Sequence, residues 1–282
     1  MKKTAVLFFL IFFCLGAGRL WYWTSDGFRL ARIEGFKGIG KERPFSAEAE
    51  NALAQRYFYL GRGRQCFAFV SEDGKYVLKF PRLDRYNDRI LFRLNFFNKE
   101  SVDWRRRSHA SRKEKLFDSF ELSFDELFEE TAIVAMFNAP KTGKEVEIFD
   151  RLNRSYRLPL EKTAFILQRK LPLFKDVFQK ALSENNEVEI NRILDSLLNL
   201  VVAIAKKGIL TKDGSFLNNF GFDETRAYQI DVGSFYRLDG EEVFSTSIHA
   251  SIETLRAWLL NLDPALLALI DRKLDPIYRE GK

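Results

Sequence analysis

Cysteine and histidine are nearly absent from this chain, and their scarcity excludes several kinds of site. Cys14, Cys66, His109 and His249 are the four such residues among 282. Cys14 lies in an N-terminal apolar run, so no disulfide framework is predicted for the folded part. Four Cys and His residues that lie far apart in the sequence do not predict a zinc site. They also argue against nucleophilic catalysis that depends on histidine. We expect both histidines at structural or surface positions.

The rest of the composition is that of a packed globular protein. Hydrophobic residues make up 46% of the chain and charged residues 30%, which argues against disorder. The 28 Phe residues predict that aromatic side chains dominate the core. The sequence shows no internal repeat and no low-complexity tract, and its length suits a single catalytic unit.

The most informative pattern lies towards the C-terminal third. Asp213 stands five residues before Asn218, and Asp231 opens an Asp-x-Gly sequence thirteen residues after that Asn. Phosphoryl-transfer enzymes use these residue types in this order as one catalytic carboxylate and two magnesium ligands. Asp213 follows a helical apolar run, and Asp231 follows a short strand-like run from Ala227 to Ile230. The alternative interpretation is structural, with the two Asp residues in turns that close a hairpin.

The segment from Tyr57 to Phe80 contains further parts of such an enzyme. Its apolar stretches are rich in aromatic and β-branched residues and predict three strands. Gly61 and Gly63 fall at the first turn, where a backbone without Cβ can approach phosphates. Lys79 ends an apolar strand and needs an anionic partner if it is buried. A nucleotide phosphate or a helix Glu would serve; the alternative is an exposed Lys on an edge strand.

A glutamate partner for Lys79 is expected on the next helix. Apolar residues recur with helical spacing from Phe117 to Asn138, which predicts one long helix there. Glu130 is the first choice because it lies about two turns before the predicted end of the helix. Glu126 and Glu129 remain alternatives.

These parts together resemble the protein-kinase-like fold over roughly residues 58 to 235. They follow one another in the expected order: a Gly-containing hairpin, a strand Lys, a Glu-bearing helix, two strands, a hinge-like connector, a helix, the Asp-x4-Asn loop and the Asp-x-Gly sequence. The two strands, the connector and the helix are expected at residues 145–149, 163–168, 168–172 and 187–206. The resemblance implies an α+β, two-lobed protein with a small antiparallel β N-lobe and a mainly helical C-lobe.

The resemblance also implies a role for each matched residue. Asp213 would accept the proton of the substrate hydroxyl, Asn218 would bind Mg²⁺, and Asp231 would bridge Mg²⁺ to the β- and γ-phosphates of ATP. Glu130 would orient the lysine that holds the α- and β-phosphates. The residues implied to contact the nucleotide are Gly61, Gly63, Lys79 and Gln168. The implied cofactors are Mg²⁺ and ATP, and the partner is a hydroxyl-bearing acceptor.

Departures from the family pattern bear on the acceptor. Cys66 stands where a third loop Gly would fall, and Ser215 stands where protein kinases usually carry a Lys. Thr211 and Lys212 precede Asp213 in place of the usual His-Arg, and no Ala-Pro-Glu follows. The pattern favours a small-molecule, sugar or lipid-linked hydroxyl, similar to aminoglycoside or lipopolysaccharide-core kinases. The alternative is a pseudokinase scaffold or a membrane-associated binding module without catalysis.

The N-terminus predicts membrane association. Two Lys residues precede an apolar run from Ala5 to Gly18, which is either a removed signal peptide or an uncleaved anchor followed by an aromatic belt over 20–23. The apolar part is about 14 residues long, against the roughly 20 that a spanning helix needs. The distribution of basic residues slightly favours a cytoplasmic domain, and export is the alternative.

The positive charge of the chain is concentrated in one segment. Residues Arg82 to Lys115 hold eleven Lys and Arg against five Asp and Glu, which equals the whole net charge of +6. This basic insertion could contact an anionic membrane surface, grip an acidic substrate, or form a solvated helical face. No recognisable nucleic-acid-binding motif is present, so no specific nucleic-acid binding is expected.

The expected division of the chain has four parts. They are an anchor or signal over 1–23, a linker and extension over 24–56, an N-lobe over 57–171 with the insertion at 82–115, and a C-lobe over 172–282.

Overall fold

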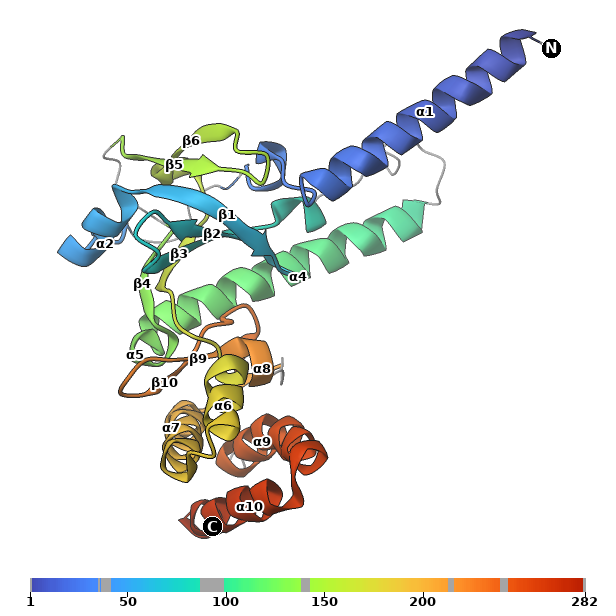
Figure 1. Cartoon of the computed structure of the whole chain (residues 1–282). Coiled ribbons are helices and arrows are strands. Elements are labelled where there is room, and N and C mark those ends of the chain that lie inside the picture. The colour runs from blue at the N-terminus through green and yellow to red at the C-terminus, as the bar shows by residue number, and fades with distance from the viewer. Residues whose placement is uncertain are drawn as a thin grey trace. The chain divides into compact units, whose positions relative to one another are not determined.

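The computed structural model describes residues 2–34, 36, 42–86, 99–137, 143–212, 216–238 and 243–280. The contacts divide the chain into two compact units (Figure 1). The sheet unit comprises residues 1–109 and 134–170, and the helical unit comprises residues 110–133 and 171–282. The protein is therefore of mixed α and β structure, with most of its strands in the first unit.

The sheet unit is built on a seven-stranded sheet in the order β4-β7-β3-β2-β1-β5-β6. Strands β1, β2 and β3 pair antiparallel, as the sequence predicts, whereas β1 and β5 pair parallel. Strand β2 buries every second residue, because successive side chains of a strand point to opposite faces. The strands are β1 (Arg56–Arg62), β2 (Cys66–Ser71), β3 (Tyr76–Pro81), β4 (Ile133–Met136), β5 (Glu145–Phe149), β6 (Ser155–Pro159) and β7 (Ile166–Arg169).

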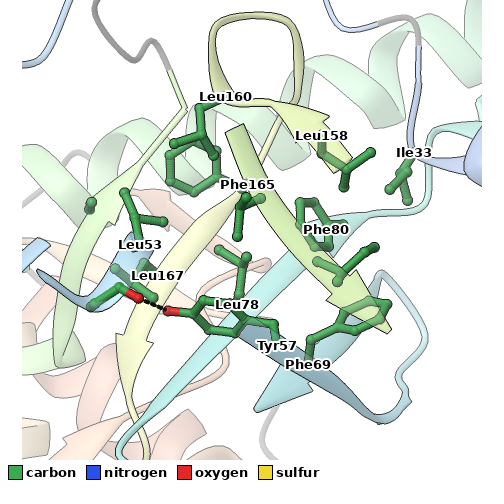
Figure 2. Close-up of a cluster of buried hydrophobic side chains, with 14 of the residues drawn as sticks. Ile33, Leu53, Tyr57, Phe69, Leu78, Phe80, Leu158, Leu160, Phe165 and Leu167 are labelled. Atoms are coloured by element: carbon green, nitrogen blue, oxygen red, sulfur yellow. Dashed lines mark hydrogen bonds between the residues drawn. The ribbon is translucent and has the colours of Figure 1, made fainter. Parts of the chain in front are cut away.

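Aromatic side chains fill the core of the sheet unit, as the composition predicts (Figure 2). The ring of Phe28 packs edge-on against those of Phe67 and Phe69, with centroids 5.2 and 5.3 Å away. Such edge-to-face pairs are favoured by the quadrupole of the rings. The hydroxyl of Tyr57 donates a hydrogen bond to the carbonyl of Ala52 at 2.9 Å, so the buried tyrosine has a partner for its polar atom.

Short helices border this sheet. Helix α2 (Ala47–Leu53) begins at Ser46, whose side chain accepts a hydrogen bond from the amide of Ala49. Three 3₁₀ turns lie in the same unit: η1 (Leu30–Arg32), η2 (Leu83–Arg85) and η3 (Leu160–Lys162).

The N-terminal segment forms helix α1 (Lys2–Thr24). Its C-terminal end contacts the sheet unit, since the guanidinium of Arg154 lies 4.6 Å from the ring of Trp21 and that of Arg62 lies 5.2 Å from the ring of Tyr22. In the part of the chain that the structure describes, no helix has both the length and the apolar character needed to span a bilayer.

The predicted single helix from Phe117 to Asn138 is wrong. Helix α4 (Lys99–Asp125) ends earlier, a short helix α5 (Phe128–Thr131) follows, and Ala132 with a φ of +54° leads into strand β4. Every residue of β4 is buried. A short apolar run that is buried on both faces shows no alternation of polar and apolar residues, so its sequence does not distinguish a strand from a helix.

The basic insertion is described only in part. Residues 87–98 lie outside the described residues, and residues 99–115 form the first part of α4.

The helical unit contains four longer helices and two small two-stranded sheets. Helix α7 (Glu187–Lys206) has the bounds that the sequence predicts, and Asn186 caps it by accepting from the amide of Glu189. The C-terminal helices α9 (Val243–Leu262) and α10 (Pro264–Glu280) are separated just before Pro264, as predicted. The other elements are α6 (Phe174–Ser183), α8 (Phe216–Asn219), β8 (Ile209–Thr211), β9 (Phe220–Phe222), β10 (Ala227–Gln229) and β11 (Phe235–Arg237).

Candidate functional site

The hairpin of β9 and β10 brings together the segments that carry two predicted metal ligands. The two strands pair antiparallel. Asn218 lies in the short helix α8, just before β9, and Asp231 follows β10 by two residues. The carbonyl of Asn219 accepts from the amides of Ile230 at 2.8 Å and Asp231 at 3.4 Å, so the end of α8 lies beside the start of the Asp-x-Gly sequence.

The side chains at this open end differ in exposure. Asn218 is exposed, whereas Asp231 is half-buried. One carboxylate oxygen of Asp231 accepts a hydrogen bond from the amide of Gly233 at 3.2 Å, which orients the carboxylate within its own turn. An amide oxygen and a carboxylate are the oxygen ligands that magnesium prefers.

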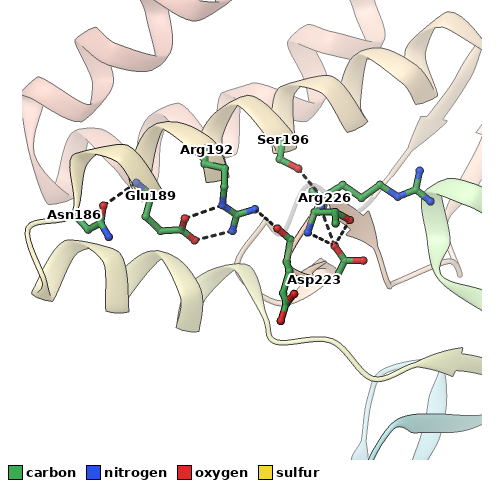
Figure 3. Close-up of polar contacts among 9 residues, drawn as sticks. Asn186, Glu189, Arg192, Ser196, Asp223 and Arg226 are labelled. Atoms are coloured by element: carbon green, nitrogen blue, oxygen red, sulfur yellow. Dashed lines mark hydrogen bonds and ion pairs between the residues drawn. The ribbon is translucent and has the colours of Figure 1, made fainter.

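The closed end of the hairpin is fixed by Asp223 (Figure 3). Its carboxylate accepts hydrogen bonds from the hydroxyl and amide of Thr225, the amide of Arg226 and the hydroxyl of Tyr228, all at 2.7 or 2.8 Å. Burial raises the pKa of Asp223, but these hydrogen bonds, with that of the Thr225 hydroxyl the strongest, outweigh it and lower the pKa to about 2.

Helix α7 holds this turn in place. The Ser196 hydroxyl accepts from the amide of Ala227 at 2.6 Å, and Arg192 donates to the carbonyl of Glu224 at 3.3 Å (Figure 3). Arg192 is itself oriented by Glu189 through two hydrogen bonds of 2.7 Å. The hairpin that carries Asn218 and Asp231 is therefore supported by a helix at its far end.

A second strand pair joins the chain on either side of the predicted catalytic loop. Thr211 of β8 pairs with Phe235 of β11, and its hydroxyl lies 2.7 Å from that of Ser234. The amide of Lys212 donates to the carbonyl of Ser234 at 3.1 Å. The chain entering the loop thus runs beside the chain leaving the Asp-x-Gly sequence. Asp213 itself lies outside the described residues.

A buried serine contacts the same Asp-x-Gly segment, and sequence reasoning missed it. The hydroxyl of Ser119 on α4 lies 2.7 Å from both the carbonyl oxygen of Val232 and the amide nitrogen of Phe235. The sequence carried a signal for it, because Ser119 falls in helical phase with the apolar residues Leu116 and Phe120.

In the sheet unit, Lys79 occupies an interior strand. Lys79 of β3 lies opposite Ala68 of β2 on one side and Ile166 of β7 on the other. The alternative of an edge-strand lysine is therefore wrong, and the side chain is half-buried. Gln168 lies on the neighbouring strand β7, paired with Val77, and is 1% exposed.

The two predicted loop glycines have room around them. A Cβ added to Gly61 would meet no atom within 4 Å, and one added to Gly63 would reach only the carbonyl oxygen of Cys66 at 3.5 Å. The amide of Gly63 donates to that same carbonyl at 2.9 Å, which closes the turn between β1 and β2. Packing within the described chain therefore does not require glycine at either position.

Glu130 has a cationic partner within the helical unit. Its carboxylate lies 2.6 Å from the ammonium of Lys207, which also donates to the carbonyl of Glu126 at 2.7 Å. The assignment of Glu130 to Lys79 stays a prediction. The alternatives Glu126 and Glu129 form ion pairs with Arg237 and Arg226.

No protein-family model and no curated protein matches the chain, whereas solved structures do. A co-crystal structure of WbdD with the kinase inhibitor LY294002 is 19% identical over 77% of this chain and 45% of that chain, with a TM-score of 0.38. A structure of the bifunctional kinase-methyltransferase WbdD is 19% identical over 75% of this chain and 43% of that chain, with a TM-score of 0.34. The chain thus covers less than half of the length of each of these two.

Proposed function

We propose that this chain is a Mg-ATP-dependent phosphotransferase of the protein-kinase-like type. The observation that carries the proposal is the contact of the Asn219 carbonyl with the amides of Ile230 and Asp231, which brings the segments of Asn218 and Asp231 together. Protein kinases hold magnesium with an Asn amide and an Asp carboxylate of this kind. The position of Lys79 on an interior strand is a second support, because a half-buried ammonium there suits a phosphate or carboxylate partner.

The donor set fits magnesium. The described residues contain no group of three or more His, Cys, Asp or Glu side chains that could hold a metal ion. Magnesium does not require one, since it commonly takes one or two protein oxygens and completes its shell with phosphates and water. Asn218 and Asp231 would hold the ion, which when bound neutralises charge on the phosphates of ATP.

The proposed reaction assigns one step to Asp213. The oxygen of the acceptor hydroxyl attacks the γ-phosphorus, the bond from that phosphorus to the β–γ bridging oxygen breaks, and ADP leaves. The hydroxyl proton passes to the carboxylate of Asp213. Lys79 would offset the negative charge of the α- and β-phosphates, with Glu130 orienting its ammonium.

The proposed acceptor is a small-molecule, sugar or lipid-linked hydroxyl. Ser215 in place of the usual loop Lys and the missing Ala-Pro-Glu argue against a peptide substrate. The alternative is a scaffold without catalysis, which the altered residues Thr211 and Lys212 before Asp213 favour.

We further propose that residues 1–23 associate the chain with a membrane. Leu20 is 61% exposed and Trp23 is 75% exposed at the end of α1, where an aromatic belt is predicted. Flotation of the full chain with anionic vesicles tests this proposal. We expect co-flotation that Leu20→Ser with Trp23→Ser weakens; equal flotation of both proteins would count against the belt.

Thermal unfolding of the full chain, with and without Mg-ATP, tests the enzyme proposal. The full chain is the right sample because Trp21 and Tyr22 of α1 contact the sheet unit. A ligand in hundredfold excess over its Kd stabilises the native state by about 2.7 kcal/mol. We expect a magnesium-dependent shift that Asp231→Asn removes and Asp195→Asn, an exposed change on α7, retains. No shift at millimolar nucleotide would favour the scaffold.

Turnover separates catalysis from binding. Asp213→Ala is expected to abolish phosphate transfer while leaving the Mg-ATP shift largely intact. Equal transfer by this variant would remove Asp213 from the role of base.

A further inference from the structure

Two serines occupy core positions on helix α4. Ser119 and Ser123 are both fully buried, one helical turn apart on the same face. Their neighbours on that face, Leu116 and Phe120, are buried apolar residues. A hydroxyl in such a place is costly unless it forms hydrogen bonds, so the partners of these serines indicate what they do.

The two hydroxyls make different bonds. Ser123 donates to the carbonyl of Ser119 at 2.5 Å, the bond within the helix that serines commonly form, and makes a longer contact of 3.4 Å with the carbonyl of Val232. Ser119 makes the shorter bonds outside the helix. Its hydroxyl donates to the carbonyl of Val232 at 2.7 Å and accepts from the amide of Phe235 at 2.7 Å.

These bonds hold the backbone that follows Asp231 in the Asp-x-Gly sequence. Val232 follows Asp231 directly, and Phe235 is the first residue of β11. One side chain therefore fixes the backbone on the C-terminal side of Asp231 at two points. Val232 is 2% exposed, so water cannot readily replace the serine as the partner of its carbonyl.

We infer that Ser119 is a positioning residue for the metal-binding carboxylate of Asp231. The inference rests on the proposed function and adds to it a residue on a different element. Its action is indirect, because Ser119 holds the loop and the loop positions the carboxylate of Asp231. Loss of the hydroxyl would leave Asp231 present but less well placed, so magnesium-dependent binding should weaken more than binding of the nucleotide alone.

The matched pair Ser119→Ala and Ser196→Ala tests this inference. Ser196 also bonds a backbone amide in the helical unit, but at the far end of the hairpin. ATP binding to the full chain is titrated with magnesium. We expect Ser119→Ala to raise the half-saturating Mg²⁺ concentration roughly tenfold, which corresponds to about 1.4 kcal/mol, with ATP affinity in the absence of magnesium unchanged. Ser196→Ala should leave the Mg²⁺ midpoint as in the wild type.

Hydrogen exchange gives a readout that needs no ligand. The amide of Phe235 should exchange faster in Ser119→Ala than in the wild type, and Ser196→Ala should not change it. Ser119→Cys keeps the side-chain volume with a weaker hydrogen-bonding group, and replaces the Ala variant if that one does not fold. An Mg²⁺ midpoint and Phe235 exchange equal to those of Ser196→Ala would overturn the inference. A wild type without magnesium-dependent ATP binding would overturn the proposed function first, and this inference with it.

Discussion

The carbonyl of Asn219 accepts hydrogen bonds from the amides of Ile230, at 2.8 Å, and Asp231, at 3.4 Å. Through this contact the end of helix α8 and the start of the Asp-x-Gly sequence lie side by side, although a dozen residues separate them. The two predicted metal ligands adjoin this contact, because Asn218 precedes Asn219 directly and Asp231 is one of the two donors. The β9–β10 hairpin is therefore what brings the two sequence motifs together.

Replacement of Gly221 by alanine should destabilise the hairpin. A Cβ at this position would lie 2.7 Å from Cβ of Leu171 and 3.2 Å from Cγ2 of Ile230, so the backbone would have to move. We expect a loss of about 1 to 3 kcal/mol in the free energy of unfolding, measured with urea. Gly61→Ala is the control, because its new Cβ would meet open space. Equal stability of the two variants would show that β9 tolerates the shift.

Asp223 should make stability depend on acid pH. Its folded-state pKa of about 2 lies below the ordinary value of 3.8, so its contribution is present above pH 3.8 and is lost as the pH falls from there towards 2. After allowance for solvent screening we expect about 1 to 2 kcal/mol at neutral pH. Urea unfolding of Asp223→Ala and wild type should therefore differ at pH 7 and converge towards pH 2. A difference in the free energy of unfolding that does not change with pH would show that the substitution acts through packing and not through the charge of Asp223.

The buried hydroxyl of Tyr57 should stabilise the sheet unit. Tyr57→Phe removes the donor to Ala52 and leaves that carbonyl without this partner. The expected loss is about 1 kcal/mol in the free energy of unfolding. Tyr76→Phe is the matched control, since the Tyr76 hydroxyl makes a longer contact of 3.4 Å, to Glu48, at a less buried position. A larger loss for Tyr76→Phe would contradict this ranking.

Glu130 and Lys207 should stabilise the helical unit as an ion pair. Their charged atoms lie 2.6 Å apart. Glu130→Gln and Lys207→Met should therefore show a coupling of about 0.5 to 1 kcal/mol in a double-mutant cycle of unfolding. Losses that simply add in the double variant would show that this pair contributes nothing to stability.

The sequence by itself determined much of the secondary structure. Runs rich in aromatic and β-branched residues predicted β1 to β3, and the helix expected at 187–206 is α7. These are local signals, because strand and helix periods are set by neighbouring residues. The order of Asp213, Asn218 and Asp231 also pointed to phosphoryl transfer before any contact was known. The sequence pattern gave the wrong prediction at Ile133–Met136, a strand that was predicted as helix. Because this strand is buried on both faces, its residues do not alternate between polar and apolar.

Tertiary structure alone decided which residues share a surface. The β9–β10 hairpin brings the segments of Asn218 and Asp231 together, and strand order places Lys79 inside the sheet rather than at its edge. The sequence places Ser119 on the apolar face of a helix, and only the structure shows that its hydroxyl bonds residues more than a hundred positions away. The physical reason is that such pairings depend on how distant segments satisfy each other's buried polar groups, which no local spacing records.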